Sequence, residues 1–187
     1  MNLSSTEKEI LLTAARESIK SLFEKAALPK IDINSYPNLK LNAGAFVTLK
    51  INEELRGCIG YITAEEPLIN TVTEVAKHAA VEDPRFPSLS RDELDQVSIE
   101  ISVLSPLMKI KDYSEIKIGE HGLLVEEGLR RGLLLPQVAT ENNFNVDQFL
   151  KSICLKAGLP PDFWKTKMLN LKVFTAQVFS EERSKNE

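Results

Sequence analysis

Histidine and cysteine are scarce in this sequence, with two of each among 187 residues. Two widely separated cysteines are typical of reduced intracellular thiols and do not form a disulfide scaffold. The four residues, Cys58, His78, His121 and Cys154, also lack the paired spacing of structural zinc sites. We therefore expect no metal, and the composition excludes a small disulfide-stapled fold.

Several familiar signatures are also missing. The chain has no Walker loop, no GxGxxG fingerprint and no GxSxG elbow, which disfavours the common nucleotide-binding and serine-hydrolase folds. Its uncharged apolar runs fall far below the ~20 residues of a membrane helix. The amino terminus, "MNLSSTEKEI", lacks the basic start and apolar core of a signal peptide, so we expect a cytoplasmic protein without membrane contact.

Excess positive charge is absent as well. The formal net charge is -4 and the pI is about 5.4, which gives no overall attraction to a phosphate backbone. Arg130 and Arg131, with Lys165 and Lys167, are too sparse and too lightly interleaved with aromatic residues to indicate a nucleic-acid surface. Nucleic-acid binding is therefore the least favoured class of function.

Hydrophobic periodicity predicts helices interspersed with hairpins. Thr6 and Glu9 resemble a capping box before a helix that continues toward Pro29, and residues 30–44 indicate an extended connection. The other expected elements are strands at 45–51, 55–61 and 97–104, a helix from Pro67, a hairpin over 121–137, a helix from Asn145 to Gly158, and a strand over 169–179. Such an order is typical of an α+β fold with mainly antiparallel sheets and flanking helices.

The stretch "LRGCIG" concentrates unusual residues in one expected strand. Gly57 and Gly60 flank Cys58, and strand alternation would place Arg56, Cys58 and Gly60 on one face. Arg56 could then stabilise a thiolate or bind an anionic ligand. The alternative is a glycine-bent strand with a buried cysteine, because unpaired cysteines are commonly buried.

The segments "LRGCIGY", "AAVEDPRF", "EISVLSPL", "GEHGLLVEEGLRRGLLLPQVA" and "FLKSICLKAGLP" together resemble the AMMECR family, named after an Alport-syndrome contiguous-deletion region. The resemblance covers about residues 5–179, with Phe144 where many relatives have tryptophan. It implies one domain over residues 1–187, with a larger subdomain from both chain ends, a smaller one from the middle, and the "LRGCIG" segment at a cleft between them. The charged tail from about residue 180 is expected to be disordered.

The resemblance implies no settled reaction, but microbial relatives are often encoded beside, or fused to, Memo-like and radical-SAM proteins. It places the functional motif on Leu55–Gly60. Two hypotheses follow. One is a cleft enzyme that binds a small anionic molecule and uses Cys58, with an unknown cofactor requirement. The other is a non-catalytic module that binds Memo-like or radical-SAM partners.

Candidate catalytic partners of Cys58 are His121, which precedes a glycine at a strand entry, and Glu100, on the polar face of the strand at 97–104. Arg56, Gly57, Gly60, Arg85 and Gln137 are the candidate ligand-binding residues. Four of these residues have structural alternatives. His121 could be a turn histidine bonded to backbone, and Glu100 could be a solvent-exposed glutamate. Arg85 could anchor its loop through Asp83 or a backbone carbonyl, and Gln137 could bond to backbone. His78 and Cys154 are expected to be structural.

Overall fold

The computed structural model describes residues 2–24 and 32–181. The chain divides into two compact units, which we call the first unit (Met1–Leu104 with Gln177–Glu187) and the second unit (Ser105–Ala176). Two antiparallel sheets and their helices give an α+β fold, as predicted. Among the described residues, none of the helices combines the length and the apolar character needed to cross a membrane.

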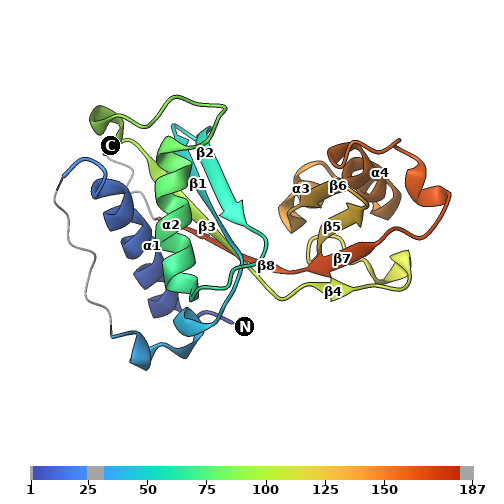
Figure 1. Ribbon diagram of the computed structural model, residues 1–187, viewed down its shortest axis with the longest axis horizontal. Helices are drawn as coiled ribbons and strands as arrows, with labels where there is room; N and C mark the ends of the chain where they lie inside the picture. The colour runs from blue at the N-terminus through green and yellow to red at the C-terminus, as the bar shows by residue number, and fades with distance from the viewer. Residues whose placement is uncertain (1, 25–31, 182–187) are drawn as a thin grey trace. The chain divides into compact units, whose positions relative to one another are not determined.

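The first unit contains a four-stranded sheet of order β2-β1-β3-β8 and two helices (Figure 1). Its elements are α1 (Ser5–Lys20), β1 (Ala45–Ile51), β2 (Glu54–Tyr61), α2 (Leu68–Val81), β3 (Ser98–Leu104) and β8 (Ala176–Ser180). Both helices pack on one face of the sheet, where they bury alternate residues of β1 and β3, among them Val47, Leu49 and Ile101. Thr48 and Glu100 therefore lie on the opposite face.

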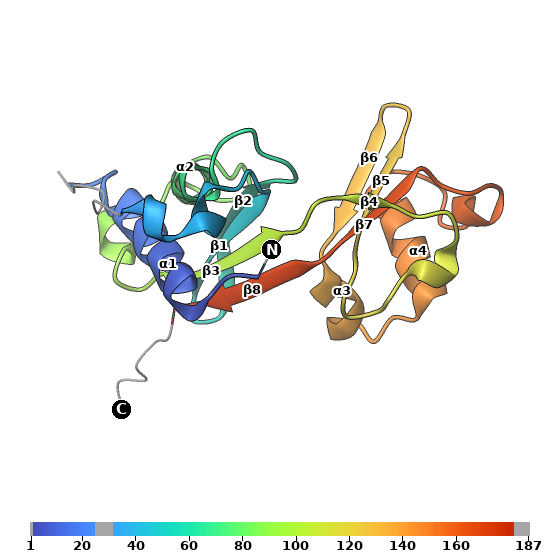
Figure 2. The ribbon, with the colours of Figure 1, turned by 90° about the horizontal axis from the view of Figure 1, so that it is seen from below.

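The second unit contains a sheet of order β4-β7-β5-β6, and α4 packs against β5 and β6 (Figure 2). Its elements are β4 (Met108–Lys109), β5 (Gly122–Glu127), β6 (Arg130–Leu134), α3 (Pro136–Glu141), α4 (Val146–Lys156) and β7 (Leu171–Phe174). The predicted capping box of α4 is present, with Asn145 and Gln148 bonded reciprocally. Gly158 has φ +69°, which explains why the helix ends there.

The capping box of α1 lies two residues earlier in the sequence than predicted. Ser4 and Glu7, rather than Thr6 and Glu9, cap the helix, because Ser4 accepts the Glu7 N–H while Glu7 accepts the Ser4 N–H. The helix ends at Lys20, well before Pro29, which lies outside the described residues. Where an extended connection was expected, Ile33–Ser35 and Pro37–Lys40 form two short 3-10 helices.

The strand predicted over residues 169–179 is two strands, β7 and β8, in two different sheets. Thr175 separates them, and its carbonyl accepts the Ser105 N–H at 2.9 Å. Hydrophobic alternation continues through such a break, so the sequence could not reveal it. In the tail, Ser180 ends β8 and Glu181 donates its N–H to the Ile99 carbonyl, whereas residues 182–187 lie outside the described residues.

Candidate functional site

Both glycines of "LRGCIG" have packing roles. Gly57 lies opposite Leu49 on the helix-facing side of β2, where an added Cβ would overlap the Ala79 carbonyl oxygen of α2. Gly60 lies opposite Phe46, whose ring occupies the space that a Cβ would need. The glycines therefore allow α2 and an aromatic ring to approach the strand closely.

Strand alternation predicts that Arg56 and Cys58 lie on the same face, but the structure separates their side chains. The register of β1 and β2 shifts between Leu49 and Lys50, which pair with Gly57 and Leu55, so Arg56 is the additional residue of a bulge. Because of the bulge, its side chain bonds a loop instead of aligning with the thiol.

The Arg56 guanidinium is almost fully engaged by that loop. Nε and Nη2 donate to the two carboxylate oxygens of Glu93, at 2.7 and 3.0 Å, and Nη1 donates to the Pro87 carbonyl at 2.9 Å. Its side chain is 12% exposed. Arg56, together with the Ser90 N–H, lowers the pKa of Glu93 to about 2. This geometry favours an anchoring role for Arg56 over binding of a free anion.

Asp83 joins the outer edge of β2 to the loop that follows α2. Its Oδ2 accepts the Cys58 N–H at 2.8 Å, and its side chain is only 3% exposed. The same carboxylate accepts the Arg85 N–H at 3.1 Å, Arg85 Nε at 2.9 Å and Arg85 Nη2 at 2.6 Å. The Arg85 hydrogen bond is the largest cause that holds the pKa of Asp83 well below its usual range. Asp83 therefore fixes both the strand edge and the arginine.

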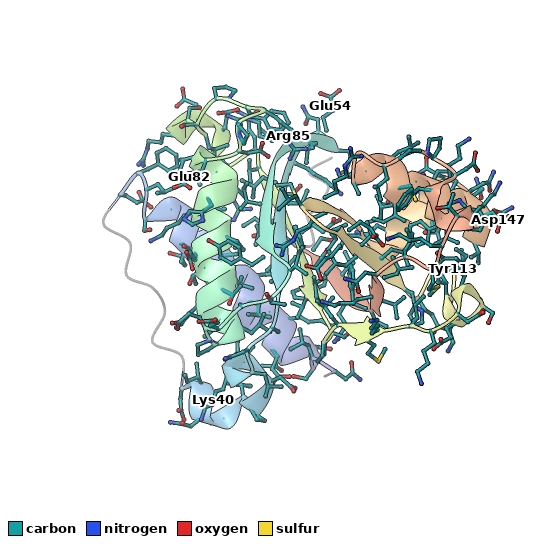
Figure 3. All side chains as sticks on the ribbon, turned by 45° about the vertical axis from the view of Figure 1, so that its right-hand side comes forward. Lys40, Glu54, Glu82, Arg85, Tyr113 and Asp147 are labelled. Atoms are coloured by element: carbon teal, nitrogen blue, oxygen red, sulfur yellow. The ribbon has the colours of Figure 1, made fainter. Side chains whose placement is uncertain are left out.

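Arg85 is the exposed cation beside Cys58, and Figure 3 shows it close to β2. Its Nη2 donates to the Cys58 carbonyl at 3.4 Å, and its side chain is 54% exposed. Asp83 is the main cause of the raised pKa of Arg85, and the charge of the Cys58 thiolate also raises it. The predicted anchoring of the loop through Asp83 and a carbonyl is therefore present, and it leaves part of the guanidinium accessible.

The thiol of Cys58 lies on the sheet face opposite the helices. Thr48 Oγ1 donates to Cys58 Sγ at 3.3 Å, and Thr48 lies opposite Cys58 in β2 and opposite Glu100 in β3. Glu100 accepts from Lys50 Nζ at 3.0 Å. A thiol, a hydroxyl and a carboxylate thus form a row across three strands, with the half-buried Cys58 at one end.

His121 belongs to the second unit, whereas the hydrogen bonds that the structure describes for Cys58 all come from the first. The ring is 9% exposed, and Nδ1 accepts the Lys117 N–H at 3.2 Å. In the neutral ring, the acceptor role of Nδ1 places the proton on Nε2. His121 has the backbone-bonded turn position that was one of its two predicted roles, and it presents a donor rather than a base.

Gln137 is the second residue of α3, a helix that the sequence analysis did not predict. Its Oε1 is buried without a hydrogen-bond partner among the described residues. Cys154 is fully buried in α4, and burial raises the pKa of its thiol. His78 lies on α2, with Nδ1 3.3 Å from the Tyr61 hydroxyl.

A hollow of the first unit is lined by residues other than Cys58 and its hydrogen-bond partners. It has a volume of about 570 Å³ and is lined by α1, residues 94–97 and Glu181. Arg16 in this hollow is bonded to Glu181 and to the carbonyls of Leu94 and Val97. Because its one well-placed cation is occupied by protein groups, we do not include the hollow in the candidate site.

Sequence reasoning missed Thr48, Lys50 and Glu93. Thr48 could have been found by pairing the predicted strands at 45–51, 55–61 and 97–104 in register, but the bulge at Arg56 makes such a register uncertain. Glu93 lies 37 residues from its partner Arg56, so no local signal connects the two. Among the described residues, no three His, Cys, Asp or Glu side chains cluster in a way that could hold a metal ion.

Comparisons with known proteins establish the family. The AMMECR1 family profile matches residues 12–179. Protein MJ0810 of Methanocaldococcus jannaschii is 45% identical over 84% of this chain and 83% of its own length, and Protein MK0488 of Methanopyrus kandleri is 44% identical over 96% and 91%. The crystal structure of the uncharacterized protein PH0010 from Pyrococcus horikoshii has a TM-score of 0.83 and 39% identity, covering 93% of this chain and 91% of that chain. The chain therefore belongs to the AMMECR1 family.

Proposed function

We propose that this protein is a thiol-dependent enzyme in which Cys58 acts on a small anionic molecule. The observation that carries the proposal is that the other unusual residues of "LRGCIG" have structural roles. Gly57 and Gly60 make room for α2 and Phe46, and Arg56 anchors a loop through Glu93. Cys58 is a half-buried free cysteine, and its backbone carbonyl accepts a hydrogen bond from the exposed cation Arg85.

The neighbours of the thiol suit a nucleophile. The Thr48 hydroxyl donates to Sγ and so fixes the position of the sulfur. Arg85 places an exposed positive charge beside the same residue, because its Nη2 donates to the Cys58 carbonyl. Glu100, in the same row of side chains, is the candidate acid or base, and it would have to exchange its contact with Lys50 for one with the substrate. We assign no proton-transfer step to His121, whose Nδ1 already accepts a backbone N–H.

Alkylation of the native protein by iodoacetamide at pH 7, followed by peptide mass spectrometry, tests this proposal. Cys58 should react faster in the native protein than in the denaturant-unfolded chain, whereas buried Cys154 should react far more slowly in the native protein. Thr48→Val keeps the shape of the side chain and removes the donor, so it should slow Cys58 several-fold. Equal or slower reaction of Cys58 in the native protein would leave the motif with a structural role only.

A non-catalytic interaction module is the second candidate, and one observation favours it. Leu129 occupies the turn between β5 and β6 and is 103% exposed, beside the exposed Arg131. Such a tip suits an apolar pocket with an acidic rim on a protein partner, and the Memo-like and radical-SAM proteins implied by the resemblance are the partners to test.

Capture of these proteins with immobilised wild-type, Leu129→Ser and Cys58→Ser chains separates the two functions. Recovery that is lost with Leu129→Ser and unchanged with Cys58→Ser supports the module. Recovery that does not depend on Leu129 contradicts it.

A further inference from the structure

We infer that Arg85 forms a subsite for a single carboxylate group beside Cys58. This inference rests on the proposed function of Cys58 and narrows its substrate to molecules that carry one carboxylate near the reacting atom. It also assigns Asp83 as the positioning residue of the subsite. Three features of the structure carry it: the orientation of Arg85, the number of donors that Arg85 has left, and the balance of charge around the thiol.

Asp83 fixes the orientation of the guanidinium. Nε and Nη2 of Arg85 both bind the Asp83 carboxylate, and Nη2 also reaches the Cys58 carbonyl. The guanidinium carbon lies 5.5 Å from the centre of the Phe86 ring, which adds a cation–π contact. Since three protein groups hold it, the arginine loses little side-chain entropy when a ligand binds.

The remaining donors of Arg85 are few. Among the described residues, Nη1 of Arg85 donates no hydrogen bond, so its two N–H groups can be donated to a ligand. One such nitrogen can bind one carboxylate group. A phosphate group, with three peripheral oxygens, is usually bound by several converging donors. The arginine of the "LRGCIG" motif, Arg56, is occupied by Glu93 and a carbonyl.

The charges around Cys58 pair one to one. Arg85 has Asp83 and Lys50 has Glu100, while Arg56, outside the environment of the thiol, has Glu93. A dianion would therefore meet no uncompensated positive charge. The pair of Arg85 and Asp83 is nevertheless polarised, because the carboxylate is 3% exposed and the guanidinium 54% exposed. Its accessible end is positive, which favours a ligand with one negative charge over a neutral one.

Two alkylating reagents of similar size test the inference. Iodoacetate and iodoacetamide both form an S–C bond with Cys58 as the C–I bond breaks, iodide leaves with the bonding electrons and the thiol proton passes to solvent. They differ in one carboxylate. At low salt the ratio of the iodoacetate rate to the iodoacetamide rate should be about fivefold higher at Cys58 in the native protein than in the unfolded chain.

Substitutions and added salt test whether Arg85 causes the higher ratio of alkylation rates. Arg85→Gln should return the ratio to its value in the unfolded chain, and Arg91→Gln should leave it unchanged, because Arg91 is an exposed arginine of the same unit that pairs with Glu24. In the wild-type protein, which needs no substitution, the ratio should fall as sodium chloride is added. Urea unfolding followed by circular dichroism shows that each variant remains folded.

Protection of Cys58 by small anions identifies the class of ligand. At pH 7 and equal ionic strength, acetate should protect Cys58 from iodoacetamide better than inorganic phosphate does, and stronger protection by phosphate would overturn the carboxylate assignment. A native ratio equal to the unfolded one, with Cys58 still reactive toward iodoacetamide, overturns this inference alone. A Cys58 that is unreactive toward iodoacetamide overturns the proposed function as well.

Discussion

Asp83 binds Arg85 through both carboxylate oxygens, at 2.9 Å to Nε and 2.6 Å to Nη2, and the same carboxylate accepts the Cys58 N–H at 2.8 Å. One buried side chain therefore connects the loop after α2, an exposed cation and the outer edge of β2. Because Cys58 is on an edge strand, its N–H would otherwise have no strand to bond. Asp83 thus satisfies the strand edge and orients the proposed subsite with the same atoms.

Asp83→Ala should destabilise the protein by about 2 kcal/mol, because it removes the buried carboxylate of a half-exposed ion pair and leaves the Cys58 N–H without its acceptor. Urea unfolding followed by circular dichroism measures this loss. Asp92→Ala is the matched control, since Asp92 is exposed on the same unit and should change stability by less than about 0.5 kcal/mol. Equal losses in both variants would contradict a structural role for the Asp83 carboxylate.

Acid should weaken this contact in a defined direction. The folded pKa of Asp83 lies well below the unfolded value of about 3.9, so its contribution is complete above that value and is lost as pH falls below it. Asp83→Asn should therefore show a smaller loss of unfolding free energy between pH 5 and pH 3 than the wild type. Parallel pH profiles for the two proteins would contradict the prediction.

Arg56→Ala should lower stability by about 2 kcal/mol without changing the iodoacetate preference of Cys58, because Arg56 bonds Glu93 and a carbonyl rather than the thiol environment. The pKa of Glu93 is held at about 2, mainly by Arg56, so this stabilisation is complete above about pH 4.3 and is lost as pH falls toward 2. Unfolding and alkylation of the same sample measure both effects. A variant that loses the charge preference would place Arg56 in the subsite.

Gly57→Ala should destabilise by about 3 kcal/mol, since its Cβ would overlap the backbone of α2 at Ala79 and neither element can shift freely. Gly128→Ala is the informative comparison. Among the described residues, no atom lies within 4 Å of a Cβ added at Gly128, but its φ is +62°, so only the backbone cost of about 1 kcal/mol is expected. Thermal unfolding of the two variants should therefore differ clearly, and equal midpoints would contradict the tight approach of α2.

Glu53→Gly should stabilise the β1–β2 hairpin by about 0.5–1 kcal/mol. Asn52 and Glu53 have φ of 51° and 65°, as in a type I′ turn, and asparagine followed by glycine is the preferred pair there. Glu54→Gly, one residue later in β2, should instead destabilise, because extended backbone gains nothing from glycine. Thermal midpoints that shift in the same direction for both variants would contradict this account.

The sequence predicts those parts of the fold that depend on residues close to one another in the chain. Local signals predicted β1, β3, the β5–β6 hairpin and the cap of α4 correctly, because alternation and capping depend on residues close in sequence. The division of the last predicted strand between two sheets depends on distant pairing, and hydrophobicity alone does not encode it.

The site was predictable in part for the same reason. Cys58 and Arg85 could be selected by residue type, and the Asp83–Arg85 contact is local. The partnership of Arg56 with Glu93 spans 37 residues and depends on a bulge, so the arginine closest to the cysteine in sequence is not the one that remains available beside it. The row from Cys58 through Thr48 to Glu100 required the register of three strands.

The pairing of β8 with β3 has a consequence for synthesis of the chain. β8 completes the sheet of the first unit, yet it follows the whole second unit in sequence. During translation, β3 therefore remains an unpaired edge strand until more than seventy further residues have been synthesised. Until β8 has been synthesised, a nascent chain exposes the edge of β3 to any neighbouring polypeptide, so we expect chaperones to bind the first unit during this interval.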